Sequence, residues 1–217
     1  MERVEPAVLV ETGRGPTVGA LRRLTGRAWL RAFGWEAVGP VPNVPRAVFV
    51  ANPHTTNWDL PFTIAVAWAL GVRVSWAGKS SLFKPPFGPL MRALGGLSIE
   101  RSRSEGQVQK IADAMRREPA VYLVIAPSGT RGARDHWKSG FYRIATEARV
   151  PLLLAFLDYG TKRGGIGPVL YPSGDLKKDM DAVRAFYRDI RGKYPENEGT
   201  IRLREEDEDA AQGSSSG

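Results

Sequence analysis

His54 and Asp59 are the residues of this sequence whose types and spacing most directly suggest chemistry. They lie in the segment Asn52-Pro53-His54-Thr55-Thr56-Asn57-Trp58-Asp59. A carboxylate that accepts a hydrogen bond from one imidazole nitrogen fixes the tautomer and raises the basicity of the other nitrogen, which can then deprotonate a hydroxyl. On a continuous helix this spacing would separate the two residues by about 140°. They therefore meet only if the chain turns, as Pro53 and Pro61 encourage.

The same segment also has a purely structural interpretation. Asp59 can cap a helix that begins at Leu60, with His54 an ordinary loop residue, and the spacing alone favours this. In support of chemistry, His54 directly follows an apolar strand, where open α/β sheets place reactive residues. The chain has 2 histidines and no cysteine. A cysteine nucleophile and a thiolate metal site are therefore excluded, and we expect no metal.

Apolar periodicity predicts the elements that position this segment. Short apolar runs favour strands at 47–51, 72–77, 97–100, 120–125 and 152–159. Helical spacing between them favours helices at 60–70, 105–117, 139–149 and 175–191. Strands that alternate with helices predict an α/β fold, with a largely parallel central sheet flanked by helices.

The chain divides into three expected parts. Residues 1–45 form a lead-in with an amphipathic helix over Thr17–Phe33, residues 46–203 form the folded domain, and residues 204–217 form a disordered tail of acidic residues followed by Gly and Ser. The helix has an arginine-rich face opposite Trp29 and Phe33. This pattern is typical of a membrane-surface helix and equally of a helix packed on the domain core.

The charge of the chain indicates an anionic partner. The formal net charge is +8, and without the acidic run Glu205–Asp209 there remain 31 basic residues against 18 acidic ones, or +13. Such a body is attracted to anionic lipid, nucleic acid or phosphorylated molecules. The longest apolar stretch, 60–71, is shorter than the ~20 residues of a membrane span, and acidic residues near the start argue against a secretory signal.

Three further segments follow His54 in a fixed order. Gly95-Gly96-Leu97-Ser98-Ile99-Glu100-Arg101 ends one strand, Ala126-Pro127-Ser128-Gly129-Thr130-Arg131-Gly132 ends another, and Val150-Pro151 opens a third. With the His54 segment, this order resembles the glycerolipid acyltransferase family, which includes the 1-acylglycerol-3-phosphate acyltransferases. That family carries Asn-His-x-x-x-x-Asp, a Gly-rich strand ending in Arg, Pro-Glu-Gly-Thr-Arg and Val-Pro. The resemblance covers about residues 46–155.

The resemblance implies transfer of a fatty acyl group from acyl-CoA or acyl carrier protein to the hydroxyl of a lysophospholipid such as lysophosphatidic acid. No cofactor is implied, and the protein would work peripherally on the cytoplasmic face of the cell membrane. His54 would be the general base and Asp59 its orienting partner. The anionic head group would be held by Arg101, Ser128, Gly129, Thr130 and Arg131. Guanidinium groups match phosphate in a bidentate manner, although most arginines are solvated surface charges.

Three positions depart from the family pattern. Ser128 replaces the family's Glu, Leu154 replaces a second proline, and Pro53 stands where the family places Asn directly before His. The lost carboxylate at position 128 leaves the acceptor open, so an amino-lipid or glycolipid acceptor is an alternative. A second alternative is a catalytically silent module that binds anionic membrane or nucleic acid through its charge. The sequence lacks a recognisable nucleic-acid-binding fold, so we expect no nucleic acid.

Other candidate residues have less support. The glycines at positions 13, 15 and 19 approach a dinucleotide fingerprint, but the spacing is one residue too long and Pro16 interrupts the turn. His136, near Arg134 and Lys138, can help to hold a phosphate or can be an exposed loop residue. Five apolar residues can line an acyl groove or, more commonly, pack in the core: Trp76, Leu82, Phe83, Phe87 and Leu90.

Overall fold

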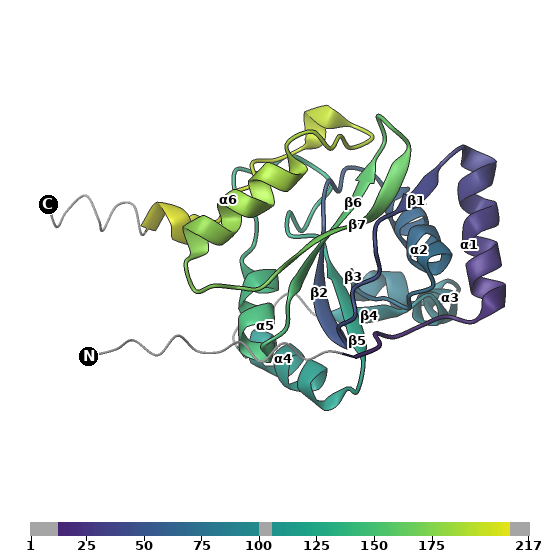
Figure 1. Ribbon diagram of the computed structural model, residues 1–217, viewed down its shortest axis with the longest axis horizontal. Coiled ribbons are helices and arrows are strands. Elements are labelled where there is room, and N and C mark those ends of the chain that lie inside the picture. The colour runs from purple at the N-terminus through teal and green to yellow at the C-terminus, as the bar shows by residue number, and fades with distance from the viewer. Residues whose placement is uncertain (1–12, 100–105, 209–217) are drawn as a thin grey trace, which may run out of the picture.

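The computed structural model describes residues 13–99 and 106–208, which form a seven-stranded sheet of order β1-β7-β6-β2-β5-β3-β4 (Figure 1). Strands β2 to β6 run parallel to one another, β7 is antiparallel to β6, and β1 is parallel to β7. This confirms the predicted largely parallel sheet. The strands are β1 (Glu36–Val38), β2 (Arg46–Ala51), β3 (Ser75–Lys79), β4 (Gly96–Ile99), β5 (Val121–Ile125), β6 (Leu152–Asp158) and β7 (Arg163–Leu170).

Helices cover both faces of the sheet. Figure 1 shows α4, α5 and α6 on one side and α2, with α1 outside it, on the other. The helices are α1 (Ala20–Phe33), α2 (Asp59–Leu70), α3 (Gly88–Ala93), α4 (Gln107–Arg117), α5 (Gly140–Ala148) and α6 (Leu176–Tyr187), with short 3₁₀ turns at Ser80–Phe83 and Pro195–Asn197. The sheet and its flanking helices confirm the predicted α/β class.

The core has separate clusters on the two faces because central strands bury both faces of the sheet. On one face, Val48 and Val50 of β2 pack against α5 and α6 through Phe141, Met180 and their neighbours. On the other face, Phe49 packs with residues of α2 and β3. Alternate side chains of β2 thus hold opposite layers, and the chain that follows β2 is fixed from both sides.

Two strands at one end of the sheet escaped the sequence analysis. β7 contains Gly164, Gly165, Gly167 and Pro168, which strand propensity disfavours, and it forms because it returns antiparallel along β6. β1 is only three residues long and pairs with β7. Residues 36–45, which we assigned to the lead-in, therefore include a strand of the central sheet.

Helix α1 packs on α2 and also presents a basic, partly apolar outer surface. Gly26 allows the close approach, since a Cβ built there would lie 2.6 Å from the Ala65 carbonyl oxygen. Leu30 is buried at the same contact, whereas Leu21 is 78% and Leu24 66% exposed. The helix therefore packs on the domain core and also exposes apolar side chains, as a membrane-surface helix would. No helix within the described residues is long and apolar enough to cross a membrane.

The acidic tail is ordered where it was expected to be disordered. Residues 204–208 form a helical turn, in which Glu206 lies 2.9 Å from Arg184 and Asp207 lies 2.7 Å from His136. The prediction was wrong for these five residues because two of their acidic side chains, Glu206 and Asp207, find basic partners on α6 and on the loop after β5. Residues 209–217 of the predicted tail lie outside the described residues.

Candidate active site

The His54 segment and the segment after β5 lie at the same edge of the sheet. β2 and β5 are parallel neighbours, with Val50 opposite Ile125, so the chain leaves both strands at their carboxyl ends side by side. Parallel strands bring loops that are distant in sequence to one edge, where α/β proteins place their ligand sites. The topology therefore assembles two of the predicted segments in one place.

His54 and Asp59 are in direct contact. The Nδ1 atom of His54 lies 2.9 Å from Oδ2 of Asp59. Because an ionised carboxylate can only accept, Nδ1 carries the proton in this hydrogen bond, and in the neutral imidazole Nε2 then has a free lone pair. The His54 side chain is 26% exposed and that of Asp59 is 6% exposed. The pair thus combines a buried carboxylate with an imidazole that a substrate can reach.

Asp59 organises the loop before α2 and does not cap the helix. Its Oδ2 atom accepts the backbone N–H groups of Thr55, at 2.9 Å, and Thr56, at 3.0 Å. The N-cap position is Trp58, which makes no side-chain cap hydrogen bond, and Asp59 is the first residue of α2. The structure therefore contradicts the capping alternative. The two backbone hydrogen bonds fold the loop around the carboxylate, and this turn brings His54 within hydrogen-bonding distance of Asp59.

Tyr159 is a further partner of Asp59, which the sequence analysis missed. Its hydroxyl donates to Oδ1 of Asp59 at 2.9 Å. Burial, then the negative charge of Asp59, raise the pKa of Tyr159 far above its usual value, so the phenol remains a hydrogen-bond donor. The signal that could have found it is its position directly after β6, at the same sheet edge as His54.

An apolar cavity adjoins the pair. It has a volume of about 50 Å³, and its lining includes His54 and Asp59 together with side chains from α2, β2, β6 and β7. Val66 and Ala67 line it from the helix, and Phe49 and Ile166 from the sheet. A polar proton-transfer pair thus lies at the border of an apolar space, an arrangement suited to a substrate with a polar reacting group and an apolar chain.

The segment after β5 forms a tight turn. The Ser128 hydroxyl donates to the Thr130 carbonyl oxygen at 2.8 Å, and Gly129 adopts a positive φ of 66°, a conformation that favours glycine. Arg131 is exposed on this turn. The structure thus brings Ser128, Gly129, Thr130 and Arg131 to the edge that carries His54. Arg101 lies outside the described residues.

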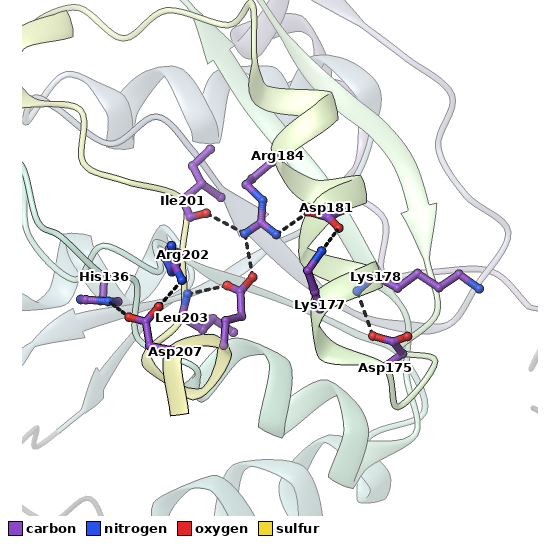
Figure 2. A network of polar contacts seen from close by, with 11 residues as sticks. His136, Asp175, Lys177, Lys178, Asp181, Arg184, Ile201, Arg202, Leu203 and Asp207 are labelled. Atoms are coloured by element: carbon purple, nitrogen blue, oxygen red, sulfur yellow. Dashed lines mark hydrogen bonds and ion pairs between the residues drawn. The ribbon is translucent and has the colours of Figure 1, made fainter. Parts of the chain in front are cut away.

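The segment after α6, residues 191–208, connects the two loops. Near His54, the backbone N–H of Tyr194 donates to Oγ1 of Thr55 at 3.3 Å, and Lys193 Nζ lies 5.6 Å from the centre of the Trp58 ring. At the other loop, the N–H of Trp137 donates to the Arg202 carbonyl at 2.7 Å, and Figure 2 shows Asp207 between His136 and Arg202. His136, a weak phosphate candidate in the sequence, is thus paired with an aspartate.

The aromatic and apolar residues proposed for an acyl groove divide into two groups. Trp76 and Phe83 are buried and stacked, with ring centres 5.8 Å apart. The other three, Leu82, Phe87 and Leu90, are exposed. None of the five lines the cavity beside His54. Core packing therefore explains the first two, and the other three form part of the molecular surface.

Comparison with known proteins identifies the family. The model of the acyltransferase family matches residues 37–155, more than half of the chain. The fold is similar to the crystal structure of the 1-acyl-sn-glycerophosphate (LPA) acyltransferase PlsC from Thermotoga maritima, with a TM-score of 0.56, 17% sequence identity and coverage of 78% of each chain. A comparison with curated proteins gave no match. With its His54 and Asp59 segment inside the matched region, the chain belongs to the acyltransferase family.

Proposed function

We propose that this acyltransferase moves a fatty acyl group from a thioester, acyl-CoA or acyl carrier protein, to the hydroxyl of a lysophospholipid-type acceptor such as lysophosphatidic acid. The observation that supports this most strongly is the 2.9 Å contact of His54 Nδ1 with a buried carboxylate beside an apolar cavity. The similarity in fold to an LPA acyltransferase supports the same class of acceptor.

The proposed reaction is a direct transfer. As the acceptor oxygen attacks the thioester carbonyl carbon, Nε2 of His54 takes the hydroxyl proton, and Asp59 stabilises the imidazolium that forms. The tetrahedral intermediate then expels the thiolate, which recovers the proton from the imidazolium. The oxygen–acyl bond replaces the sulfur–acyl bond, and both partners are ready for another turnover. The scheme uses no covalent acyl-enzyme, metal or redox cofactor.

Two parts of the site are assigned to the two ends of the substrates. The apolar cavity between α2 and the sheet would receive the part of the acyl chain that lies next to the thioester, because the cavity lining is mainly hydrocarbon. Arg131, at the same edge, would hold the anionic head group of the acceptor, with Arg101 as the family resemblance implies. The turn at Ser128, Gly129 and Thr130 would shape that pocket. Since Ser128 replaces a carboxylate, Ser128→Glu should change the preference among acceptors.

We also propose that the protein works at an anionic membrane surface. The exposed Leu21 and Leu24 share α1 with four exposed arginines, Arg22, Arg23, Arg27 and Arg31. Each basic residue near an anionic surface contributes about 1 kcal/mol. Flotation with phosphatidylserine-containing vesicles should show binding that weakens with salt. Equal binding to neutral phosphatidylcholine vesicles would limit α1 to its packing role on α2.

The decisive experiment is a thioester-release assay with purified full chain. Acyl-CoA and acyl carrier protein donors are each combined with lysophosphatidic acid, an uncharged monoacylglycerol, an amino-lipid and a glycolipid acceptor. We expect product only with functional His54 and highest kcat/KM with lysophosphatidic acid. Equal use of the uncharged acceptor would replace the phosphate-acceptor proposal with the non-phosphate alternative. Absence of transfer from every donor to every acceptor would contradict the acyltransferase function itself.

A further inference from the structure

Tyr159 is held rigidly beside the His54–Asp59 pair. Its ring packs edge-on against Trp35, at 4.8 Å between centres, and against Phe62, at 6.1 Å. Its backbone N–H donates to the Arg191 carbonyl at 2.9 Å. Such edge-to-face contacts are the preferred packing of aromatic rings and favour this orientation of the Tyr159 ring. The hydroxyl is thus brought to Asp59 by packing against Trp35, just before β1, and Phe62 of α2, and by the segment after α6.

The neighbouring residue Asp158 secures this arrangement. Its Oδ1 atom accepts the backbone N–H groups of Gly160, at 3.1 Å, and Arg191, at 3.2 Å. Its Oδ2 atom accepts the Thr161 hydroxyl at 2.5 Å. The carboxylate therefore ties the end of β6 to the turn that follows and to the segment after α6. Tyr159 lies between Asp158 and Gly160, which this carboxylate joins, and this arrangement keeps the Tyr159 hydroxyl close to Asp59.

The hydrogen bonds of Asp59 are distributed unevenly between its two oxygens. Oδ2 receives three donors, from His54, Thr55 and Thr56, whereas Oδ1 receives the Tyr159 hydroxyl. A carboxylate has about four lone-pair positions, so these four donors satisfy it. In a buried site each donor spreads part of the negative charge. Removing Tyr159 would leave more of that charge to act on the imidazole.

We propose that Tyr159 is a positioning residue of the transferase site, which sets how strongly Asp59 attracts the proton of His54. The catalytic part of this inference rests on the proposed function. The effect of Tyr159 on the His54 proton does not depend on that function. With the phenol present, the shared carboxylate orients the imidazole without holding it permanently protonated. Without the phenol, the imidazolium is stabilised more, and His54 becomes a usable base only at higher pH.

Among the described residues, the ionisable groups that act on the Tyr159 hydroxyl are Asp59 and Tyr194. Tyr194 and Lys193 come from the segment after α6, where Lys193 Nζ lies 5.8 Å from the centre of the Tyr194 ring. The charge of Tyr194 contributes least among the causes that raise the pKa of Tyr159. Asp158 is engaged with its backbone donors and Thr161. Within the described residues, Tyr159 is the ionisable side chain besides His54 that hydrogen-bonds to Asp59.

A second tyrosine–aspartate pair provides a matched control. Tyr142 of α5 donates its hydroxyl to Oδ2 of Asp179 at 2.8 Å. Asp179 is buried in the first turn of α6, as Asp59 is in that of α2. Tyr142 and α6 belong to the core on the opposite face of the sheet from α2. Tyr142→Phe therefore removes the same group from the same kind of partner, away from His54.

The test compares Tyr159→Phe with Tyr142→Phe in a His136→Gln background, which leaves His54 as the one imidazole in the chain. NMR titration of that imidazole requires no substrate. We expect the midpoint to move to higher pH in Tyr159→Phe and to stay in place in Tyr142→Phe. Transfer by Tyr159→Phe should fall at neutral pH by the factor by which the midpoint shift lowers the neutral fraction of His54, and approach that of the wild type at alkaline pH.

The outcomes separate this inference from the proposed function. An unmoved midpoint, or a loss of transfer that is uniform across pH, would assign Tyr159 a purely structural role while acyl transfer itself stands. A shifted midpoint in a protein without transfer activity would uphold the coupling of Tyr159 to His54 and overturn the proposed function. Equal shifts in both tyrosine variants would overturn the inference, because they would show a general effect of removing a phenol.

Discussion

The two histidines of this chain each hydrogen-bond to an aspartate, in very different surroundings. His54 lies 2.9 Å from Asp59, and His136 lies 2.7 Å from Asp207. The Asp59 side chain is 6% exposed, whereas that of Asp207 is 43% exposed. Figure 2 shows that Asp207 also contacts Arg202, whose side chain is exposed as well. The length of the bond thus does not distinguish the two pairs, but the environment of the carboxylate does.

This difference has a physical consequence. At the buried pair, the low dielectric surroundings strengthen the effect of the carboxylate on the imidazole. Backbone N–H groups also hold the carboxylate in its orientation. At the exposed pair, water and salt screen the charges and leave a modest attraction. His54 also donates through Nδ1 and retains Nε2 for a substrate, whereas His136 already uses Nε2 for Asp207. The first pair is suited to proton transfer and the second to holding residues 204–208 against the loop after β5.

The largest expected difference is between the two histidines. His54→Ala should lower kcat by about 10³-fold or more, since no other base is in contact with the acceptor hydroxyl in the proposed reaction. His136→Ala should retain activity within about threefold of the wild type. Steady-state transfer assays, with circular dichroism to verify folding, measure both. Transfer by His54→Ala within tenfold of the wild type would refute the mechanism.

The next largest difference in activity is expected between substitutions of the two aspartates, Asp59 and Asp207. In Asp59→Asn the new amide can donate to Nδ1, which moves the imidazole proton to Nε2 and removes the base, so kcat should fall by about 10²- to 10⁴-fold. Asp207→Asn loses only a screened surface attraction and should keep wild-type kcat. Single-turnover kinetics at saturating acceptor would isolate the chemical step. Similar losses in the two variants would mean that Asp59 has no special role in that step.

The sequence predicted the first pair because it is local. His54 and Asp59 lie in one short segment after a strand, and the chain itself forms the turn that joins them. Tyr159 reaches the same carboxylate from 100 positions away. That contact depends on the pairing of β2 with β6, and no local pattern in the sequence records which strands become neighbours.

The same reasoning explains the errors in the tail and in β7. Composition predicted disorder for residues 204–208, but their charges are matched by Arg184 and Arg202 and by His136. The glycine-rich sequence of β7 gives little strand signal, but its antiparallel return along β6 supplies the missing hydrogen bonds. In both cases the partners are distant in sequence, so local propensity pointed the wrong way. The mainly parallel order of the other strands was predictable because most of the apolar runs are followed by a helical segment.

An intermediate effect is expected for Arg131, on the turn after β5, compared with Arg202, which contacts Asp207. Arg131→Ala should raise the acceptor KM so that kcat/KM falls about ten- to a hundredfold, the value of a charge-assisted contact. Donor hydrolysis should be unchanged. Arg202→Ala, which loses an exposed ion pair with Asp207, is the matched control and should leave KM as it is. Arg131→Lys should not rescue, because an ammonium group lacks the planar fork. An unaltered KM in Arg131→Ala would remove that arginine from the acceptor site.

The smallest effect is expected from the charge of Asp207 on stability. The hydrogen bond from His136, followed by the charge of Arg202, lowers the pKa of Asp207 in the folded protein. A carboxyl group with a lowered folded pKa stabilises the protein above its unfolded pKa of about 3.9, and this stabilisation disappears as the pH falls through the folded value. Asp207→Asn should therefore lower Tm slightly at pH 6, and the difference should shrink as the pH falls through the folded pKa of Asp207 and vanish once the carboxyl is protonated. High salt should reduce the difference at pH 6, since the pair is exposed.

Differential scanning calorimetry across this pH range measures the difference in Tm, with Asp189→Asn as an exposed control. A Tm difference that stays constant as the pH falls through this range would mean that Asp207 acts through its hydrogen bonds or its shape and not through its charge, and the contrast with buried Asp59 would then concern geometry more than electrostatics.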